Sequence, residues 1–241
     1  MKIIKDVIAF AGDIFFPRRC PFCGEVLVFG RNGPCESCRP KLQYVGKDFC
    51  LKCGKPLTDH SGEYCSACKR SVRPFDMGRS VFVYDDLVKR SLSSLKYNNK
   101  REYAGYFASQ IVLCYERTIR SAGFDAIVPV PVSRERMRKR GYNQAELVAK
   151  KVSDITGIPL RNDILIRVRD TVAQKDLGRA GRQKNLKNSF KITGNVVELE
   201  TIMVIDDIYT TGSTMSGIAG VLKEAGVKKV CFFTVATGSA I

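Results

Sequence analysis

The chain of 241 residues has 44% apolar and 27% charged side chains, a composition typical of a globular protein with one main domain and a smaller accessory one. It carries 40 basic and 24 acidic residues, and its formal charge of +16 favours anionic partners such as phosphates, nucleic acid or an acidic protein face. The single histidine, His60, lies among cysteines. This excludes a Ser-His-Asp triad, a Cys-His pair or a HExxH zinc site from the rest of the chain.

Residues 1–17 are predicted to form a short amphipathic helix that ends at Pro17. Asp6 and Asp13 interrupt the apolar stretch and no small-residue cleavage site follows, which argues against a signal peptide. No apolar run in the chain approaches the roughly 20 residues that span a bilayer. We expect the helix to pack on the protein's own core, with contact to a membrane surface as the alternative. Its apolar residues at helical spacing are Ile4, Val7, Ile8, Ala11, Ile14 and Phe15.

A duplicated cysteine module is predicted over residues 18–72. Two stretches share the pattern C-x2-C-G, ten further residues and C-x2-C. Four CxxC pairs without an export signal indicate a reducing compartment and two structural Zn²⁺ sites, rather than disulfides or a redox centre. Local pairing within each repeat is the simplest arrangement, and crossed pairing stays open. The eight predicted ligands are Cys20, Cys23, Cys35, Cys38, Cys50, Cys53, Cys65 and Cys68.

Three residues of similar chemistry are not expected to bind metal. His60 is predicted to be a loop residue, because neither four-cysteine set lacks a ligand. Cys114 and Cys231 lie in apolar stretches and are predicted to be inert core residues.

Residues 79–241 are predicted to form an α/β domain. Five strands separated by helices indicate a mainly parallel sheet that is covered on both faces. The predicted strands are Ser80–Tyr84, Ala126–Val130, Ile164–Val168, Thr201–Ile205 and Lys229–Val235, and the clearest helices are Tyr103–Arg120, Asn143–Thr156 and Ser213–Ala225.

The stretch VIDDIYTTGSTM, Val204 to Met215, predicts a ligand site at the carboxyl end of a strand. Free amides at the start of the following helix suit one phosphate, and two adjacent carboxylates suit hydroxyl groups or Mg²⁺. Together they fit a ribose 5-phosphate. An ordinary helix cap by Ser213 or Thr211 is the plainer interpretation. A Walker loop is excluded because no Gly-Lys-Ser/Thr follows.

Two basic segments could bind further phosphates. Ser133–Gln144 follows a predicted strand, and its guanidinium groups suit pyrophosphate; a solvated helix face is the alternative. Arg167–Asn185 holds two glycines and is predicted to be either a mobile lid over the ligand site or an ordinary surface loop. Both could instead follow a nucleic-acid backbone. Tyrosines near basic residues could stack on bases or simply pack: Tyr97, Tyr103, Tyr106 and Tyr142.

VIDDIYTTGSTM resembles the signature of type I phosphoribosyltransferases, which bind phosphoribosyl pyrophosphate (PRPP) with Mg²⁺. The resemblance implies that Asp206 and Asp207 take the ribose hydroxyls. It implies a five-stranded, mainly parallel sheet, and a lid among Gln174, Lys175 and Arg182. The residues implied for the 5-phosphate are Thr210, Thr211, Gly212, Ser213 and Thr214, and those for pyrophosphate are Val132, Ser133, Arg134, Arg138 and Arg140.

The whole chain more closely resembles the ComF (ComFC) competence proteins, which join a zinc-ribbon region to a phosphoribosyltransferase-like domain. The match includes LKY around Lys96, PVPVSRERMRKRGYNQ, RDTVAQ and RQKN. It implies a role in natural transformation at the cytoplasmic side, with single-stranded DNA, PRPP and other competence proteins at the inner face of the membrane as partners. An active phosphoribosyltransferase with an unknown acceptor and a PRPP-sensing regulator are the alternatives. No catalytic residue is identified.

Overall fold

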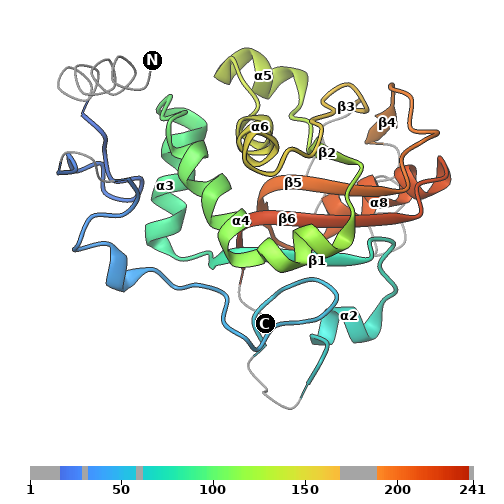
Figure 1. The fold of residues 1–241 in the computed structure, drawn as a ribbon, viewed down its shortest axis with the longest axis horizontal. Helices are drawn as coiled ribbons and strands as arrows, with labels where there is room; N and C mark the ends of the chain where they lie inside the picture. The colour runs from blue at the N-terminus through green and yellow to red at the C-terminus, as the bar shows by residue number, and fades with distance from the viewer. Residues whose placement is uncertain (1–16, 29–31, 58–61, 169–188, 239–241) are drawn as a thin grey trace, which may run out of the picture.

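The computed structural model describes residues 17–28, 32–57, 62–168 and 189–238. At its centre lies a four-stranded parallel sheet in the order β1-β6-β5-β2 (Figure 1). The strands of this sheet are β1 (Met77–Val83), β2 (Ala126–Pro129), β5 (Thr201–Tyr209) and β6 (Lys229–Thr237). The α-helices are α2 (Ser66–Arg70), α3 (Asp86–Tyr97), α4 (Tyr103–Ala122), α5 (Arg134–Arg140), α6 (Gln144–Thr156) and α8 (Ser213–Glu224), with a 3-10 turn, η1 (Arg39–Lys41).

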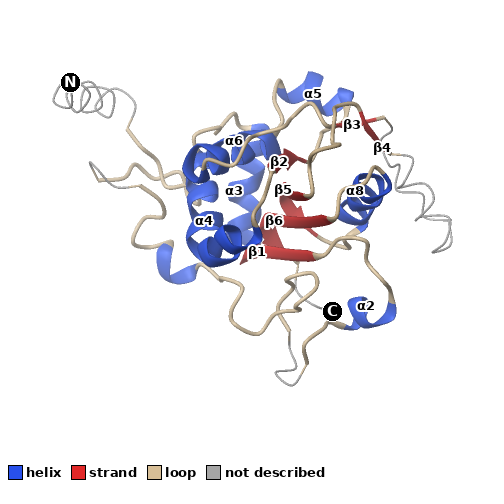
Figure 2. Cartoon of the chain, turned by 45° about the vertical axis from the view of Figure 1, so that its right-hand side comes forward, coloured by secondary structure: helices blue, strands red, loops and turns tan. Residues whose placement is uncertain are grey.

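Side chains of the central strands alternate between two separate cores, as the two-residue period of a strand requires. Met203 and Phe233 belong to a core formed with α3, α4 and α6. Val204 and Phe232 belong to a second core formed with α8. Figure 2 shows α3, α4 and α6 together on one side of the sheet and α8 on the other. The predicted parallel sheet with both faces covered is therefore confirmed.

The prediction of a fifth strand in this sheet is wrong in detail. The predicted strand Ile164–Val168 forms β3 (Leu165–Arg167), which pairs antiparallel with β4 (Phe190–Ile192) in a separate two-stranded sheet. Beside β2, a single parallel bridge between Ile127 and Leu160 takes the fifth position. The local pattern of residues indicates a strand but carries no information about its partner, and this explains the difference.

The strand that carries the acid pair is longer than predicted. β5 continues through Asp206 and Asp207 to Tyr209, whereas the apolar run ends at Ile205. Pairing with β6 extends as far as Tyr209 and Thr237, so the neighbouring strand supplies hydrogen-bond partners beyond the apolar run. The acids are consequently held by a sheet rather than by a loop.

The linker between the two cysteine modules covers the edge of the sheet at β1. The first module (20–38) lies beside α3 and the second module (50–68) beneath β1 (Figure 1). Between them, Val45 N donates to Val81 O at 2.8 Å and Val83 N to Gln43 O at 2.8 Å. These bonds use the free edge of β1, which would otherwise be open to another strand.

Several predictions have a simple outcome. Cys231 is fully buried, as predicted, but Cys114 is exposed because it lies on the outward face of α4.

The predicted N-terminal helix, His60 and the lid segment fall outside the described residues, wholly or for the most part. The proposed boundaries at 17, 72 and 79 remain predictions. Within the described part of the chain, none of the helices combines the length and apolarity needed to cross a bilayer.

Candidate anion site and metal centres

The acid pair lies where the carboxyl ends of two parallel strands meet. Pro129 of β2 is the register partner of Ile205 of β5, and Val130 N donates to Ile205 O at 2.9 Å. Asn143, which caps α6 through a 3.0 Å bond from Ala145 N, also donates to Val130 O at 3.0 Å. This arrangement brings the segment after β2 and the start of α6 beside the two carboxylates, which is the edge where parallel sheets bind ligands.

Asp207 is buried and held by two side chains from outside its strand. Lys96, in the last turn of α3, forms an ion pair with it. Gln144 Nε2 donates to Asp207 Oδ1 at 3.3 Å. Burial alone would raise the pKa of Asp207, but the charge of Lys96 and the hydrogen bonds outweigh it and hold that pKa below its usual range. Asp207 is therefore a carboxylate whose negative charge is already compensated.

Asp206 has the opposite electrostatic environment. Burial, and then the adjacent charge of Asp207, raise the pKa of Asp206 well above its usual range. Its Oδ1 accepts a hydrogen bond from Asp207 N at 2.8 Å. The two neighbouring acids thus separate into one that ionises easily and one that retains its proton more readily, as expected for close like charges. A cation or a set of hydroxyl donors would favour ionisation of both.

The loop after β5 forms the start of α8 in a conformation that suits a phosphate. Gly212 occupies the N-cap position with φ 80°, so neither Ser213 nor Thr211 caps the helix in the way the plainer interpretation requires. The hydroxyls of Thr211 and Ser213 instead lie 2.8 Å apart and bond each other. The first-turn amides of α8 are without a side-chain cap among the described residues. Together with the helix dipole, these amides and hydroxyls form an anion cradle.

Gly212 is required at this turn for two reasons. Its positive φ is unfavourable for other residues, and a Cβ atom there would lie 2.4 Å from the Tyr209 hydroxyl oxygen. The hydroxyl group of Tyr209 therefore supports the loop from beneath.

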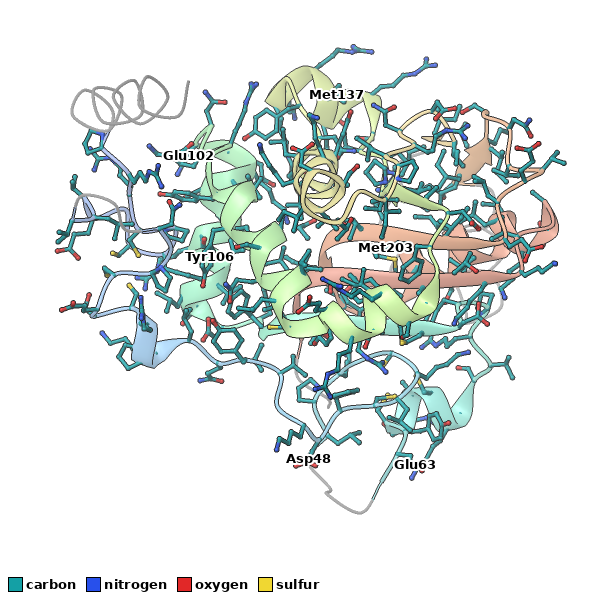
Figure 3. The ribbon with its side chains drawn as sticks, viewed as in Figure 1. Asp48, Glu63, Glu102, Tyr106, Met137 and Met203 are labelled. Atoms are coloured by element: carbon teal, nitrogen blue, oxygen red, sulfur yellow. The ribbon has the colours of Figure 1, made fainter. Side chains whose placement is uncertain are left out.

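The basic segment after β2 is a helix, α5, rather than a loop. Ser133 Oγ accepts from Arg136 N at 3.3 Å and so caps it. Arg134 and Arg138 are exposed, and Lys139 pairs with Glu135 along the helix at 2.8 Å. Figure 3 places Met137 at the rim of the molecule on this helix. Most of its charges thus lie on a solvated face, and the anion-binding roles of Val132, Ser133, Arg134 and Arg138 remain predictions.

Arg140, the last residue of α5, is connected to the acid pair through Gln144. Its Nη1 donates to Gln144 Oε1 at 2.8 Å and its Nη2 to the Tyr97 hydroxyl at 2.9 Å. Gln144 in turn bonds Asp207, which Lys96 also contacts. A chain of polar contacts therefore joins three elements, α3, α5 and α6, to β5.

Lys96, Tyr97 and Gln144 are functional candidates that sequence reasoning did not assign to the site. Lys96 and Gln144 lie inside motifs that resemble the ComF family, and that resemblance was the available signal. No local pattern could have linked them to Asp207, since Gln144 is 63 residues away along the chain. The lid candidates Gln174, Lys175 and Arg182 lie outside the described residues.

The eight paired cysteines form two groups, each within one repeat. The sulfur atoms in each group all lie within 4.8 Å of one another, which matches local rather than crossed pairing: Cys20, Cys23, Cys35 and Cys38, and Cys50, Cys53, Cys65 and Cys68. A tetrahedral Zn²⁺ with Zn–S bonds of about 2.3 Å sets sulfurs roughly 3.8 Å apart. The Cys23–Cys35 and Cys53–Cys65 separations are 3.5 Å and 3.7 Å. Both groups therefore fit structural Zn²⁺.

Comparisons with known proteins agree with both parts of the chain. The double zinc ribbon domain family matches residues 11–69. Competence protein F of Haemophilus influenzae is 29% identical over 221 residues, covering 90% of this chain and 95% of its own. Competence protein ComFC of Bacillus subtilis is 31% identical over 80% of this chain and 78% of its own. The DNA utilization protein YhgH of Escherichia coli K12 is 30% identical over 89% and 94%.

The chain belongs to the ComF family. Among solved structures, a purine phosphoribosyltransferase from Pyrococcus horikoshii overlaps 55% of this chain and 83% of its own with 14% identity and a TM-score of 0.33. The relatives confirm the ComF resemblance read from the sequence. The combination of a double zinc ribbon with a parallel α/β domain is confirmed as well.

Proposed function

We propose that this ComF-family chain binds PRPP with Mg²⁺ at the junction of β5 and α8. The observation that carries the proposal is the position of an acid pair on β5 beside the uncapped start of α8. The cradle of Thr210 to Thr214 takes the 5-phosphate through amides and hydroxyls. Asp206 and Asp207 accept hydrogen bonds from the ribose hydroxyls, and the positive charge of the Mg²⁺ bound with the ligand favours Asp206 as a carboxylate.

The polar network around Asp207 contains the cations that would bind the pyrophosphate. Arg140 and Lys96 are the cations of that network, and both reach it from elements outside β5. An incoming pyrophosphate competes with Asp207 for Lys96 and with Gln144 for Arg140. The contacts of the ligand-free site would then be exchanged for contacts with the ligand, without exposing an unpaired charge.

Isothermal titration calorimetry with PRPP and MgCl₂ tests the site. We expect binding in the wild type and at least about a hundredfold loss in Asp206→Asn/Asp207→Asn, since two groups that bind the ligand are neutralised. Asp154→Asn on the exposed face of α6 is the matched control and should bind normally. Omission of Mg²⁺ should weaken binding of PRPP but not of ribose 5-phosphate. Unchanged binding in the double variant would contradict the assignment.

We also propose that the chain contacts single-stranded DNA during natural transformation, on the cytoplasmic side of the membrane. Three observations support this: the basic balance of 40 to 24 residues, the exposed basic face of α5, and the relatives named for competence and DNA utilization. Contacts to a phosphate backbone release counterions, so the affinity must fall as salt rises. Fluorescence anisotropy with a labelled oligonucleotide between about 50 and 200 mM salt tests this. An affinity independent of salt would refute the backbone contacts.

The reaction, if the chain performs one, is tested separately. Pyrophosphate release from PRPP in the presence of a panel of nucleobases would support the transferase alternative. PRPP binding without release across the panel would favour a PRPP-sensing role. Association with other competence proteins at the membrane is tested by co-purification from membrane and soluble fractions.

A further inference from the structure

Among the four tyrosines that the sequence places near basic residues, one presents its ring to solvent. Tyr97, the last residue of α3, is 69% exposed. Tyr103 and Tyr142 are buried. The half-buried Tyr106 ring packs against the Phe22 ring at 5.7 Å. Of these four, Tyr97 is therefore the one whose ring is available to stack on a ligand.

Arg140 holds the Tyr97 ring in one orientation. The Arg140 guanidinium carbon lies 4.7 Å from the ring centroid, and Nη2 donates to the Tyr97 hydroxyl at 2.9 Å. A guanidinium group covers one face of an aromatic ring, so the exposed area of Tyr97 belongs to the other face and the edge. Tyrosine has only two side-chain torsions, and a ring restrained in this way binds a second planar group at little cost in entropy.

The backbone that carries Tyr97 is also held in place. The buried Tyr142 hydroxyl donates to Leu95 O, two residues before Tyr97. The Arg101 guanidinium carbon in turn lies 4.3 Å from the Tyr142 ring centroid. The end of α3 is therefore attached to the segment after α5, and Tyr142 has a packing role that leaves no ring face for a ligand. A rigid support of this kind preorganises the exposed ring.

Two routes place the Tyr97 ring beside the acid pair. Its chain neighbour Lys96 forms the ion pair with Asp207. On the other route, Arg140 Nη1 donates to Gln144 Oε1 at 2.8 Å, and Gln144 Nε2 donates to Asp207 Oδ1 at 3.3 Å. The ring therefore lies next to both cations to which the pyrophosphate is assigned.

We propose that Tyr97 stacks on a nucleobase at the pyrophosphate side of the PRPP site. The inference rests on the proposed function for the ligand that lies beside the base. Stacking on a tyrosine suits every base, because each base has a π-face. The charges of Lys96 and Arg140 suit phosphates next to that base. The base comes either from a single strand of DNA or from a free nucleobase that serves as acceptor, and both present the same planar ring to Tyr97.

Tyr97→Trp tests the stacking directly, because the chain contains no other tryptophan. Oligothymidylate, adenine and uracil are titrated separately, each with and without PRPP and Mg²⁺. We expect a saturable loss of indole emission with at least one of them, since stacked bases quench the indole. Loss with the oligonucleotide alone identifies the strand as the source of the base, and loss with a free base identifies the acceptor.

Two controls make this titration decisive. Tyr64→Trp, at an exposed tyrosine of the second module, corrects for light absorbed by the bases and should show no saturable loss. An abasic oligonucleotide of the same length should leave the emission of Tyr97→Trp unchanged. Equal loss with the abasic strand, or no loss with any of the ligands, would overturn the proposal.

Removal of the ring tests the same contact through affinity. We expect Tyr97→Leu to raise the Kd of the quenching ligand about tenfold, while Tyr97→Phe, which keeps the ring, should stay within about twofold of the wild type. Tyr64→Leu is the matched control and should bind normally. Stacking releases no counterions, so Tyr97→Leu should leave the salt dependence of oligonucleotide binding unchanged. Full affinity in Tyr97→Leu, or an equal loss in Tyr97→Phe, would refute the stacking.

Failure of the proposed function gives a different result from failure of the stacking. If PRPP produces no binding heat in the wild type, the PRPP site is refuted, and the titrations of Tyr97→Trp without PRPP still decide the role of the ring. If PRPP binds and the wild type binds the oligonucleotide in a salt-dependent way, the proposed function stands. Absence of quenching in Tyr97→Trp then refutes the stacking alone.

Discussion

The two cysteine modules have the same motif and different environments. Cys53 of the second module is 1% exposed, whereas its counterpart Cys23 in the first module is exposed, although Cys20 and Cys50 are both fully buried. The second module belongs to the core shared with α8 and the first to the core shared with α3 and α4. A duplicated metal-binding unit thus differs according to the surface on which it packs, although its ligand geometry is the same.

The glycine that follows the first CxxC pair of each module shows how differently the two modules pack. Gly24 and Gly54 both have positive φ, 78° and 72°. A Cβ at Gly54 would lie 2.5 Å from Gly78 O of β1, while a Cβ at Gly24 would have no described atom within 4 Å. Lys52 O also accepts from Gly78 N at 2.8 Å. The second module is therefore in direct contact with the central sheet, and its loss should disturb the whole domain.

Removing one ligand from each module should give the largest contrast. We expect Cys53→Ser to destabilise the chain by about 4 kcal/mol, because it leaves a buried core without its metal. Cys23→Ser, at an exposed ligand, should cost about half as much. Urea unfolding followed by circular dichroism, with zinc content by mass spectrometry, measures both. Equal losses would show that the two modules contribute alike to the fold.

Phe22→Ala should detach the first module from its core and leave the second module in place. The ring is buried against Phe82, Tyr106 and Phe107, so its removal should cost about 3 kcal/mol. Limited proteolysis should then cut near residues 20–38 while the second Zn²⁺ stays bound. Loss of both ions at the same rate would indicate that the modules form one cooperative unit.

The glycine pair gives a smaller and sharper contrast. Both Gly→Ala changes place a side chain at positive φ, which costs about 1 kcal/mol. Gly54→Ala adds a clash with the backbone of β1 and should cost about 2 to 3 kcal/mol in total. Thermal unfolding of the two variants measures the difference. A Gly24→Ala variant that is destabilised as strongly would contradict the contrast in packing.

The pH dependence of PRPP binding should depend on neither Cys23 nor Cys35. Because the pKa of Asp206 is raised, its carboxylate forms only as pH rises above the usual range of about 4, so affinity should increase with pH by up to tenfold per unit. Asp207, with its lowered pKa, is already ionised there. Calorimetry from about pH 5 upward measures the slope.

Asp206→Asn supplies the control, because the slope that remains in it belongs to the ligand's own phosphates. Cys23→Ser/Cys35→Ser should reproduce the wild-type slope, because the pKa of Asp206 is governed by its burial, by Asp207 and by Lys96 rather than by either cysteine. A changed slope in that variant would connect the first module to the site and remove the contrast between the two modules.

Local patterns in the sequence were sufficient for much of this protein. Each cysteine group closes within one repeat, and the acid pair with its loop occupies one strand–helix junction, so residues near in sequence determine them. Apolar strand segments that alternate with segments of helical spacing predicted the parallel sheet with covered faces.

Contacts between distant segments were decided only by the tertiary structure. β3 pairs with β4 instead of joining the main sheet, and Cys114 faces solvent. Arg140 is half-buried and bonds Gln144, while Arg134 and Arg138 are exposed. The ion pair between Lys96 and Asp207 also joins distant segments. Such contacts depend on how complete elements pack, and a residue's type and local spacing carry no information about that packing.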